Sequence, residues 1–229
     1  MRPEVTKKFV ESIEPFLDNI NSVAIVGGSL AEPEILELQE IKEVMVDVYG
    51  VEESEYFFDL NKDNRCEKKY DLVLCSQVME HIWNIEKGVE NLKELTKVGG
   101  LLWLGCPASN RSHGSPDYYS AGYQPELFVE LFKSKGWEII IQGRLGAARL
   151  YFMTHALRFW PNEKELKRPI SSYDFSRLPG PLFLDLLRFL RDLPGRFYSL
   201  TLSPEISDEV EFATETYLLI RRPSNLLER

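Results

Sequence analysis

Cysteine is scarce in this sequence, and its few copies follow no known spacing. Only Cys66, Cys75 and Cys106 occur among 229 residues, and no two of them form a Cys-x-x-Cys pair. This argues against a disulfide framework and a structural zinc site, because both need closely spaced thiols. The three histidines also lack metal-ligand spacing, so we expect no metal site. Unpaired thiols favour a reducing compartment such as the cytoplasm.

Long hydrophobic runs are missing as well. The longest stretches without a charged residue, 19–31 and 98–110, have 13 residues each, whereas a membrane-spanning helix needs roughly 20. Near the N-terminus, Lys7, Lys8 and Glu11 interrupt the region where a signal peptide would have its apolar core. These features predict a soluble, cytoplasmic protein.

Positive charge is in deficit over the chain as a whole. The sequence has 27 Lys and Arg against 36 Asp and Glu, a formal net charge of −9, so we expect no nucleic-acid partner. Residues 144–199 differ, with ten basic residues, five acidic ones and ten of the 27 aromatics. We therefore expect a core over 1–143, a basic aromatic insertion over 144–203, and a C-terminal strand over 204–229 that returns to the core sheet.

Strand-like and helix-like patterns alternate along the chain. Helical spacing of apolar residues predicts helices from Pro33 onward, over 85–96 and over 124–135. Short apolar runs predict strands at 22–26, 44–48, 55–60, 70–75, 101–106, 137–142 and 214–220. The alternation predicts an α/β fold: a Rossmann-like, mostly parallel seven-stranded sheet with helices on both faces and an antiparallel final strand.

Ligands of such sheets bind at the carboxyl ends of the strands. The first predicted strand runs into Gly27-Gly28, a turn that lets a ligand approach the backbone closely. Asp47 ends the second strand, where a carboxylate can accept both hydroxyls of a ribose. Asp59 and Leu60 end the third and offer an acceptor and an apolar edge to a purine. Together they indicate a nucleoside-containing cofactor, although each also fits a plain turn or strand-end cap.

The turn after the first strand decides which cofactor is favoured. Ser29 and Glu32 stand where a dinucleotide fingerprint starting at Gly27 needs glycine, which disfavours a nicotinamide-linked oxidoreductase, and no P-loop motif occurs anywhere. A negatively charged turn region repels a pyrophosphate but attracts a sulfonium cation. The features favour S-adenosylmethionine (SAM).

Several motifs then follow one another in a characteristic order. They are VAIVGGS, VMVDVYG, FFDLN, YDLVLCSQVMEHI and LTKVGGLLWLGCP, with HGSPDYYSAGYQPELFVELFKSKGWEI after them. In this order the sequence resembles the class I SAM-dependent methyltransferases of the broad type 11 group, over 20–143 and the last strand. It departs from them at Ile25, where members usually carry an acidic residue. Glu32 is an alternative ligand for the methionine end of the cofactor.

The resemblance implies a role for each residue that matches a motif. Asp47 would bind the ribose hydroxyls, and Asp59 with Leu60 would lie beside the adenine. The residues implied near the methionine, ribose and sulfonium are Gly27, Gly28, Ser29, Ser76, Gln77 and Val78.

Methyl transfer to a hydroxyl needs a base within hydrogen-bond reach, whereas a carboxylate acceptor needs none. His113, in the polar loop after the fifth strand, and His81, in the Glu80-His81 pair, are the candidate catalytic residues. Both also have structural interpretations, His113 as a solvated loop residue and His81 as a helix-start residue.

The predicted function is methylation, at oxygen, of a small-molecule or saccharide acceptor. A non-catalytic methyltransferase-like protein, acting as a scaffold or partner subunit, is the alternative that Ile25 favours. The apolar face of 182–193 must be buried against the core, a second copy in a homodimer, or a membrane surface. The basic insertion would suit an anionic substrate.

Overall fold

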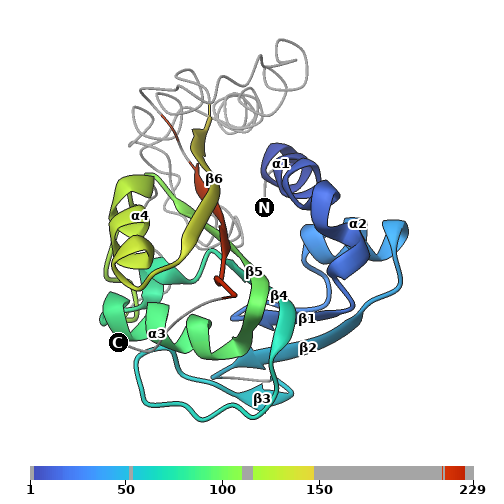
Figure 1. The fold of residues 1–229 in the computed structure, drawn as a ribbon. Helices are drawn as coiled ribbons and strands as arrows, with labels where there is room; N and C mark the ends of the chain where they lie inside the picture. Colours follow the sequence, from blue (N-terminus) through green and yellow to red (C-terminus); the bar gives the residue numbers. More distant parts are fainter. Residues whose placement is uncertain (1–2, 52–53, 110–115, 147–212, 214, 225–229) are drawn as a thin grey trace, which may run out of the picture. The chain divides into compact units, whose positions relative to one another are not determined.

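The computed structural model describes residues 3–51, 54–109, 116–146, 213 and 215–224 (Figure 1). Most of the predicted insertion over 144–203, including the segment 182–193, therefore lies outside the described residues, as does His113. The three-part division of the chain stays a prediction.

The described core is built on one seven-stranded sheet in the order β3-β2-β1-β4-β5-β7-β6. The first five strands pair in parallel, while β7 is antiparallel to both β5 and β6. This confirms the predicted fold class, including the antiparallel final strand. The strands are β1 (Ser22–Val26), β2 (Met45–Gly50), β3 (Tyr56–Phe57), β4 (Tyr70–Ser76), β5 (Thr96–Pro107), β6 (Glu138–Leu145) and β7 (Glu215–Arg221).

Helices cover both faces of this sheet. Figure 1 shows α1 and α2 together on one side, and α3 and α4 on the other. Two short 3₁₀ segments complete the described elements. The helices are α1 (Pro3–Ile13), α2 (Pro33–Ile41), α3 (Ile85–Leu95) and α4 (Pro125–Ser134), and the 3₁₀ segments are η1 (Glu14–Asn19) and η2 (Met79–His81).

The strand pattern explains why both faces are covered. In β4 and β5 every residue from Leu72 to Cys75 and from Leu101 to Leu104 is buried, so neither face can be left to solvent. Valine, leucine and cysteine side chains on one face pack with α3 and α4. On the other face, Phe9 of α1 meets the ring of Trp103 edge-on, with ring centroids 5.3 Å apart.

The ends of two strands differ from the prediction in a way that matters for the site. β2 continues to Gly50, beyond the expected end at residue 48, because Val26 of β1 pairs with Tyr49. β3 is only two residues long, so Phe58, Asp59 and Leu60 form a loop rather than a strand.

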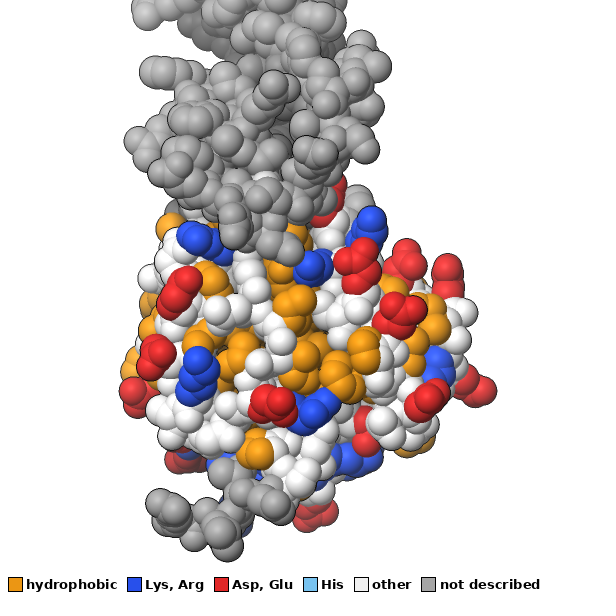
Figure 2. Space-filling model, turned by 45° about the horizontal axis from the view of Figure 1, so that its top comes forward, with side chains coloured by type: hydrophobic (Ala, Val, Ile, Leu, Met, Phe, Trp, Pro, Cys, Tyr) orange, Lys and Arg blue, Asp and Glu red, His pale blue; other side chains and the backbone are white. Residues whose placement is uncertain are grey.

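The surface of the core has mixed charge. Figure 2 shows acidic and basic side chains interspersed around a group of hydrophobic side chains on the face that it draws. None of the helices in the described part of the chain combines the length and apolarity that crossing a membrane requires.

Candidate cofactor-binding site

A cavity of about 400 Å³ lies at the carboxyl edge of the sheet, where β1, β2 and β4 end. Its volume falls within the range of small-molecule sites, and it combines apolar walls with a few polar groups. The apolar walls come from Val26, Val51, Phe58, Leu60, Val78 and Ile82, and the polar side chains are Asp59, Asn61, Gln77, His81 and Asp117.

The glycine turn after β1 forms one wall of this cavity. Gly27 has φ +72°, a conformation that favours glycine, and a Cβ there would lie 2.7 Å from Cγ2 of Val78. Gly28 is confined differently: a Cβ there would lie 3.0 Å from both Oε1 of Glu32 and Cγ2 of Ile25. The Glu32 carboxylate therefore stands beside Ile25, next to the turn.

The loop after β3 is held in place from several directions. The Asp59 carboxylate accepts the Asn61 N–H at 3.0 Å and pairs with Lys62 at 3.0 Å. Burial raises the pKa of Asp59, but these contacts outweigh it and hold the pKa below its ordinary value. From α3, the Asn91 amide donates to the carbonyl of Leu60 at 3.0 Å. The Asp59–Asn61 loop is thus fixed before any ligand arrives.

The residue after β4, Gln77, adopts an unusual backbone conformation for a side chain of its kind. Its φ is +57°, its N–H donates to the Gly105 carbonyl at 2.8 Å, and its amide donates to the Glu215 carboxylate at 2.9 Å. Strain of this kind persists only where the surroundings hold the residue, and it is concentrated at functional sites. Gln77 connects the cavity to the start of β7.

His81 reaches the cavity from η2. Its Nδ1 lies 2.5 Å from the backbone carbonyl of Asp117, which can only accept. Nδ1 therefore donates this hydrogen bond, and in the neutral ring the lone pair is then on Nε2. The N–H groups of Tyr119 and Ser120 donate to the Glu80 carbonyl, at 2.9 and 3.2 Å, and tie the Asp117 segment to η2.

Asp47 does not lie at the strand end where the sequence analysis placed it. It pairs with Ala24 in the interior of the sheet, and its carboxylate accepts from the Tyr70 hydroxyl and from Lys68, at 3.2 Å to Nζ. Among the described residues that line the cavity, the end of β2 is represented by Gly50 and Val51 instead. Asp47 therefore lies inside β2 and is already engaged by Tyr70 and Lys68, which disfavours the predicted ribose role.

Six of the candidate residues do meet at the cavity: Gly27, Asp59, Leu60, Gln77, Val78 and His81. Others lie nearby without lining it. Ser29 accepts the Ala31 N–H at 3.3 Å within an exposed turn, and the Ser76 hydroxyl is buried against Gly105. In the part of the chain that is described, no cluster of His, Cys, Asp or Glu is arranged to hold a metal ion.

Sequence reasoning missed several residues of the cavity. Val51 and Phe58 could have been predicted if β2 had been extended to Gly50 and β3 ended at Phe57. Asn61 directly follows Leu60, and Ile82 directly follows His81, so both adjoin residues that the sequence analysis named. Asp117 lies in the loop after the fifth predicted strand, which was expected over the site, but its contact with His81 is visible only in the fold.

Comparisons with known proteins agree on the architecture. No protein-family model and no curated protein matches the sequence. Among solved structures, a SAM-dependent methyltransferase from Archaeoglobus fulgidus matches with a TM-score of 0.51 and 13% identity, over 95% of this chain and 93% of that one.

Two further structures have higher TM-scores. The O-methyltransferase of a trans-AT PKS multienzyme of Brevibacillus brevis, in complex with S-adenosyl-L-homocysteine, matches at 0.55 with 12% identity, over 95% of this chain and 72% of that one. The [4+2]-cyclase SpnF matches at 0.55 with 13% identity, over 96% and 81%. At such identities the likeness concerns the fold: the chain has the fold of the class I SAM-dependent methyltransferases.

Proposed function

We propose that the protein is a SAM-dependent methyltransferase and that the carboxyl-edge cavity binds its cofactor. One observation carries the proposal: the cavity brings together the glycine turn, the Asp59–Asn61 loop and the segment after β4, which are far apart in the sequence. The cavity has a volume of about 400 Å³, with a backbone turn on one side and a fixed polar loop on the other. These features fit a nucleoside with an amino-acid chain attached to it, as in SAM.

The adenosine end of SAM fits the part of the cavity formed by the loop after β3. Phe58, Leu60 and Ile82 supply apolar surface for a flat purine, and the Asp59–Asn61 loop supplies polar atoms at its edge. Because this loop is already held by Lys62 and Asn91, little ordering is needed on binding.

For the methionine end we propose Glu32. Its carboxylate lies beside Ile25 and Gly28. It therefore supplies negative charge close to the position in the motif VAIVGGS where Ile25 replaces the usual acidic residue. When bound, SAM would supply an electrophilic methyl group on a good neutral leaving group.

The acceptor is proposed to be a small-molecule or saccharide hydroxyl, with His81 as the base. Its Nε2 lone pair can take the proton of a hydroxyl as the oxygen attacks the methyl group, while the Asp117 carbonyl holds the ring through Nδ1. The protein otherwise has to align the acceptor and exclude water.

A non-catalytic role as a scaffold or partner subunit is the second candidate. It is favoured by Ile25 in the first motif, and by the fact that this fold also serves a protein named as a cyclase. A cytoplasmic location, the absence of a nucleic-acid partner, and contact of 182–193 with a second copy or a membrane surface also stay predictions.

A transfer assay separates the two candidates. Purified protein is incubated with methyl-labelled SAM and a panel of sugar nucleotides and small hydroxyl compounds, and label in the organic or saccharide product is counted. We expect transfer to at least one hydroxyl acceptor, lost in His81→Ala. Saturable SAM binding without transfer to any acceptor would favour the non-catalytic role.

A further inference from the structure

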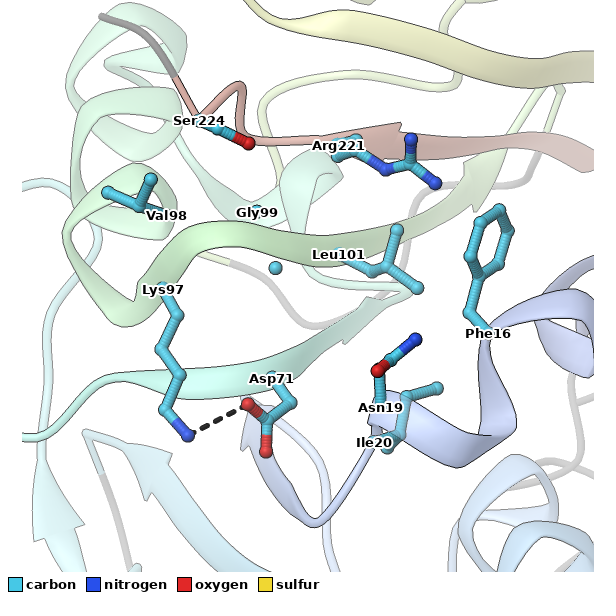
Figure 3. A pocket seen from close by; sticks show the side chains of 11 residues that line it. Phe16, Asn19, Ile20, Asp71, Lys97, Val98, Gly99, Leu101, Arg221 and Ser224 are labelled. Carbon is cyan, nitrogen blue, oxygen red and sulfur yellow. Dashed lines mark hydrogen bonds and ion pairs between the residues drawn. The ribbon is translucent and has the colours of Figure 1, made fainter.

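A second cavity, of about 450 Å³, lies at the opposite edge of the sheet (Figure 3). It is bounded by the starts of β4 and β5, the end of β7 and the 3₁₀ segment η1. It shares no residue with the carboxyl-edge cavity, so the proposed cofactor site does not account for it.

Arg221, near the end of β7, forms one side of this cavity. Its guanidinium carbon lies over the Phe16 ring, 4.8 Å from the ring centre, in the range of a cation–π contact. Within the described residues, its guanidinium makes one hydrogen bond, a long one of 3.5 Å to Glu138. A guanidinium has five N–H donors, so most of its hydrogen-bonding capacity is unused.

Lys97 stands on the other side, and the carboxylate near it is already satisfied. Asp71 Oδ2 accepts from the N–H of Asn21 and from both the N–H and the hydroxyl of Ser22, while Oδ1 pairs with Lys97 at 2.8 Å. Lys97 and Asp71 neutralise each other. Arg221, whose ion-pair partner Glu138 lies outside the cavity lining at 3.5 Å, is the remaining cation among the side chains that line it.

The floor between the two sides is kept open by a glycine. Gly99 has φ +78°, which favours glycine, and a Cβ there would meet no atom within 4 Å. Figure 3 shows Lys97 and Arg221 on opposite sides of this floor, with Leu101 between them and the Asn19 amide on the side of Phe16. The cavity thus combines one cation, an amide and an apolar strip.

We propose that this second cavity binds a small oxyanion, a phosphate ester or a carboxylate, through Arg221. The planar fork of a guanidinium matches both groups with two parallel hydrogen bonds, and Phe16 holds the fork in position. The Asn19 amide and Ser224 hydroxyl are further donors in the cavity wall, and Leu101 contacts the apolar part of the ligand. The site is independent of methyl transfer.

Inorganic phosphate and acetate are the probes, titrated into the whole protein and followed by calorimetry at constant ionic strength. Arg221→Gln removes the main ligand, Phe16→Leu removes the ring that holds it, and Arg144→Gln is the matched control. Arg144 lies on β6 at the other edge of the sheet and donates to Gln124, away from the cavity. Circular dichroism and the thermal midpoint without ligand verify the fold of each variant.

We expect saturable binding of phosphate, acetate or both to one site. Arg221→Gln should weaken it about tenfold or more, since hydrogen bonds to a charged group are lost. Phe16→Leu should weaken it about threefold although no charge changes, and Arg144→Gln should leave it unchanged. Binding of phosphate alone indicates a phosphate ester, binding of acetate alone indicates a carboxylate, and binding of both means that the site accepts either oxyanion.

Three results would overturn the proposal: no saturable binding, equal binding by Arg221→Gln, or displacement of the anion by S-adenosylhomocysteine. Binding of S-adenosylhomocysteine is also measured by itself on the same protein. The failure of the anion proposal can therefore be told apart from the failure of the proposed function.

Discussion

Gly27 and Val78 are in direct contact across the carboxyl edge of the sheet: a Cβ on Gly27 would lie 2.7 Å from Cγ2 of Val78. The turn after β1 and the loop after β4 are therefore packed together without a ligand. Position 27 requires glycine for two reasons: its φ is +72°, and Val78 leaves no room for a Cβ.

Gly27→Ala should therefore destabilise the protein by about 1–3 kcal/mol, from the strained φ together with the clash. Adding Val78→Ala removes the clash but not the φ strain. We expect the double variant to lose less free energy of unfolding than the two single variants together, as measured by urea denaturation. Additive losses would mean that the two residues are not in contact.

Asp47 should matter for stability and not for the cofactor. Asp47→Asn weakens the hydrogen bonds from Tyr70 and Lys68 and should cost about 1 kcal/mol of unfolding free energy. Its affinity for S-adenosylhomocysteine should stay close to that of the unchanged protein. A large loss of affinity at unchanged stability would restore the ribose role that the sequence suggested.

Glu34, at the start of α2, should make the protein less stable as pH rises. Its side chain is fully buried, and desolvation raises its pKa from 4.5 to about 7. Between those values the folded state holds a proton that the unfolded state has released, so stability falls as pH rises through this window and then levels off. The loss of stability over this window is on the order of 3 kcal/mol.

Glu34→Gln removes this titration and keeps the shape of the side chain. The difference in unfolding free energy between Glu34→Gln and the unchanged protein should therefore grow in favour of the variant from pH 4.5 to 8. A difference that stays constant over this range would contradict the buried, protonated state of Glu34.

His81→Ala should separate chemistry from binding once an acceptor is known. A base commonly contributes about 10²- to 10⁴-fold, so the turnover rate should fall by that order while the affinity for S-adenosylhomocysteine changes little. His81→Asn is the companion variant, since the amide nitrogen of Asn stands where Nδ1 does and can donate to the Asp117 carbonyl but cannot act as a base. Full turnover in His81→Asn would leave a structural role only.

The core of the fold was predictable because its signals are local. The apolar run of β1 is visible in the sequence, as are Pro125 at the start of α4 and Gly136 just after its end. Both elements lie where they were expected. The Asp59–Leu60 pair was expected at the cavity for the same reason, because it lies within the motif FFDLN.

The errors arose where a residue's environment comes from distant parts of the chain. Asp47 looked like a strand end because Tyr49-Gly50 is less apolar than the run before it, and its partners Lys68 and Tyr70 come from another strand region. In the same way, the place of Asp117 at the cavity depends on contacts of its segment with His81 and with the Glu80 carbonyl, far away in the sequence.

The most direct test of the cofactor site is a calorimetric titration with S-adenosylhomocysteine of the unchanged protein and of two variants with a tryptophan on β2 or just after it. Val51, 57% exposed, lines the cavity, whereas Met45, 72% exposed, begins the same strand at the other edge. We predict micromolar binding that Val51→Trp abolishes and Met45→Trp keeps. No binding by the folded, unchanged protein, or equal binding by Val51→Trp, would contradict the proposed cofactor site.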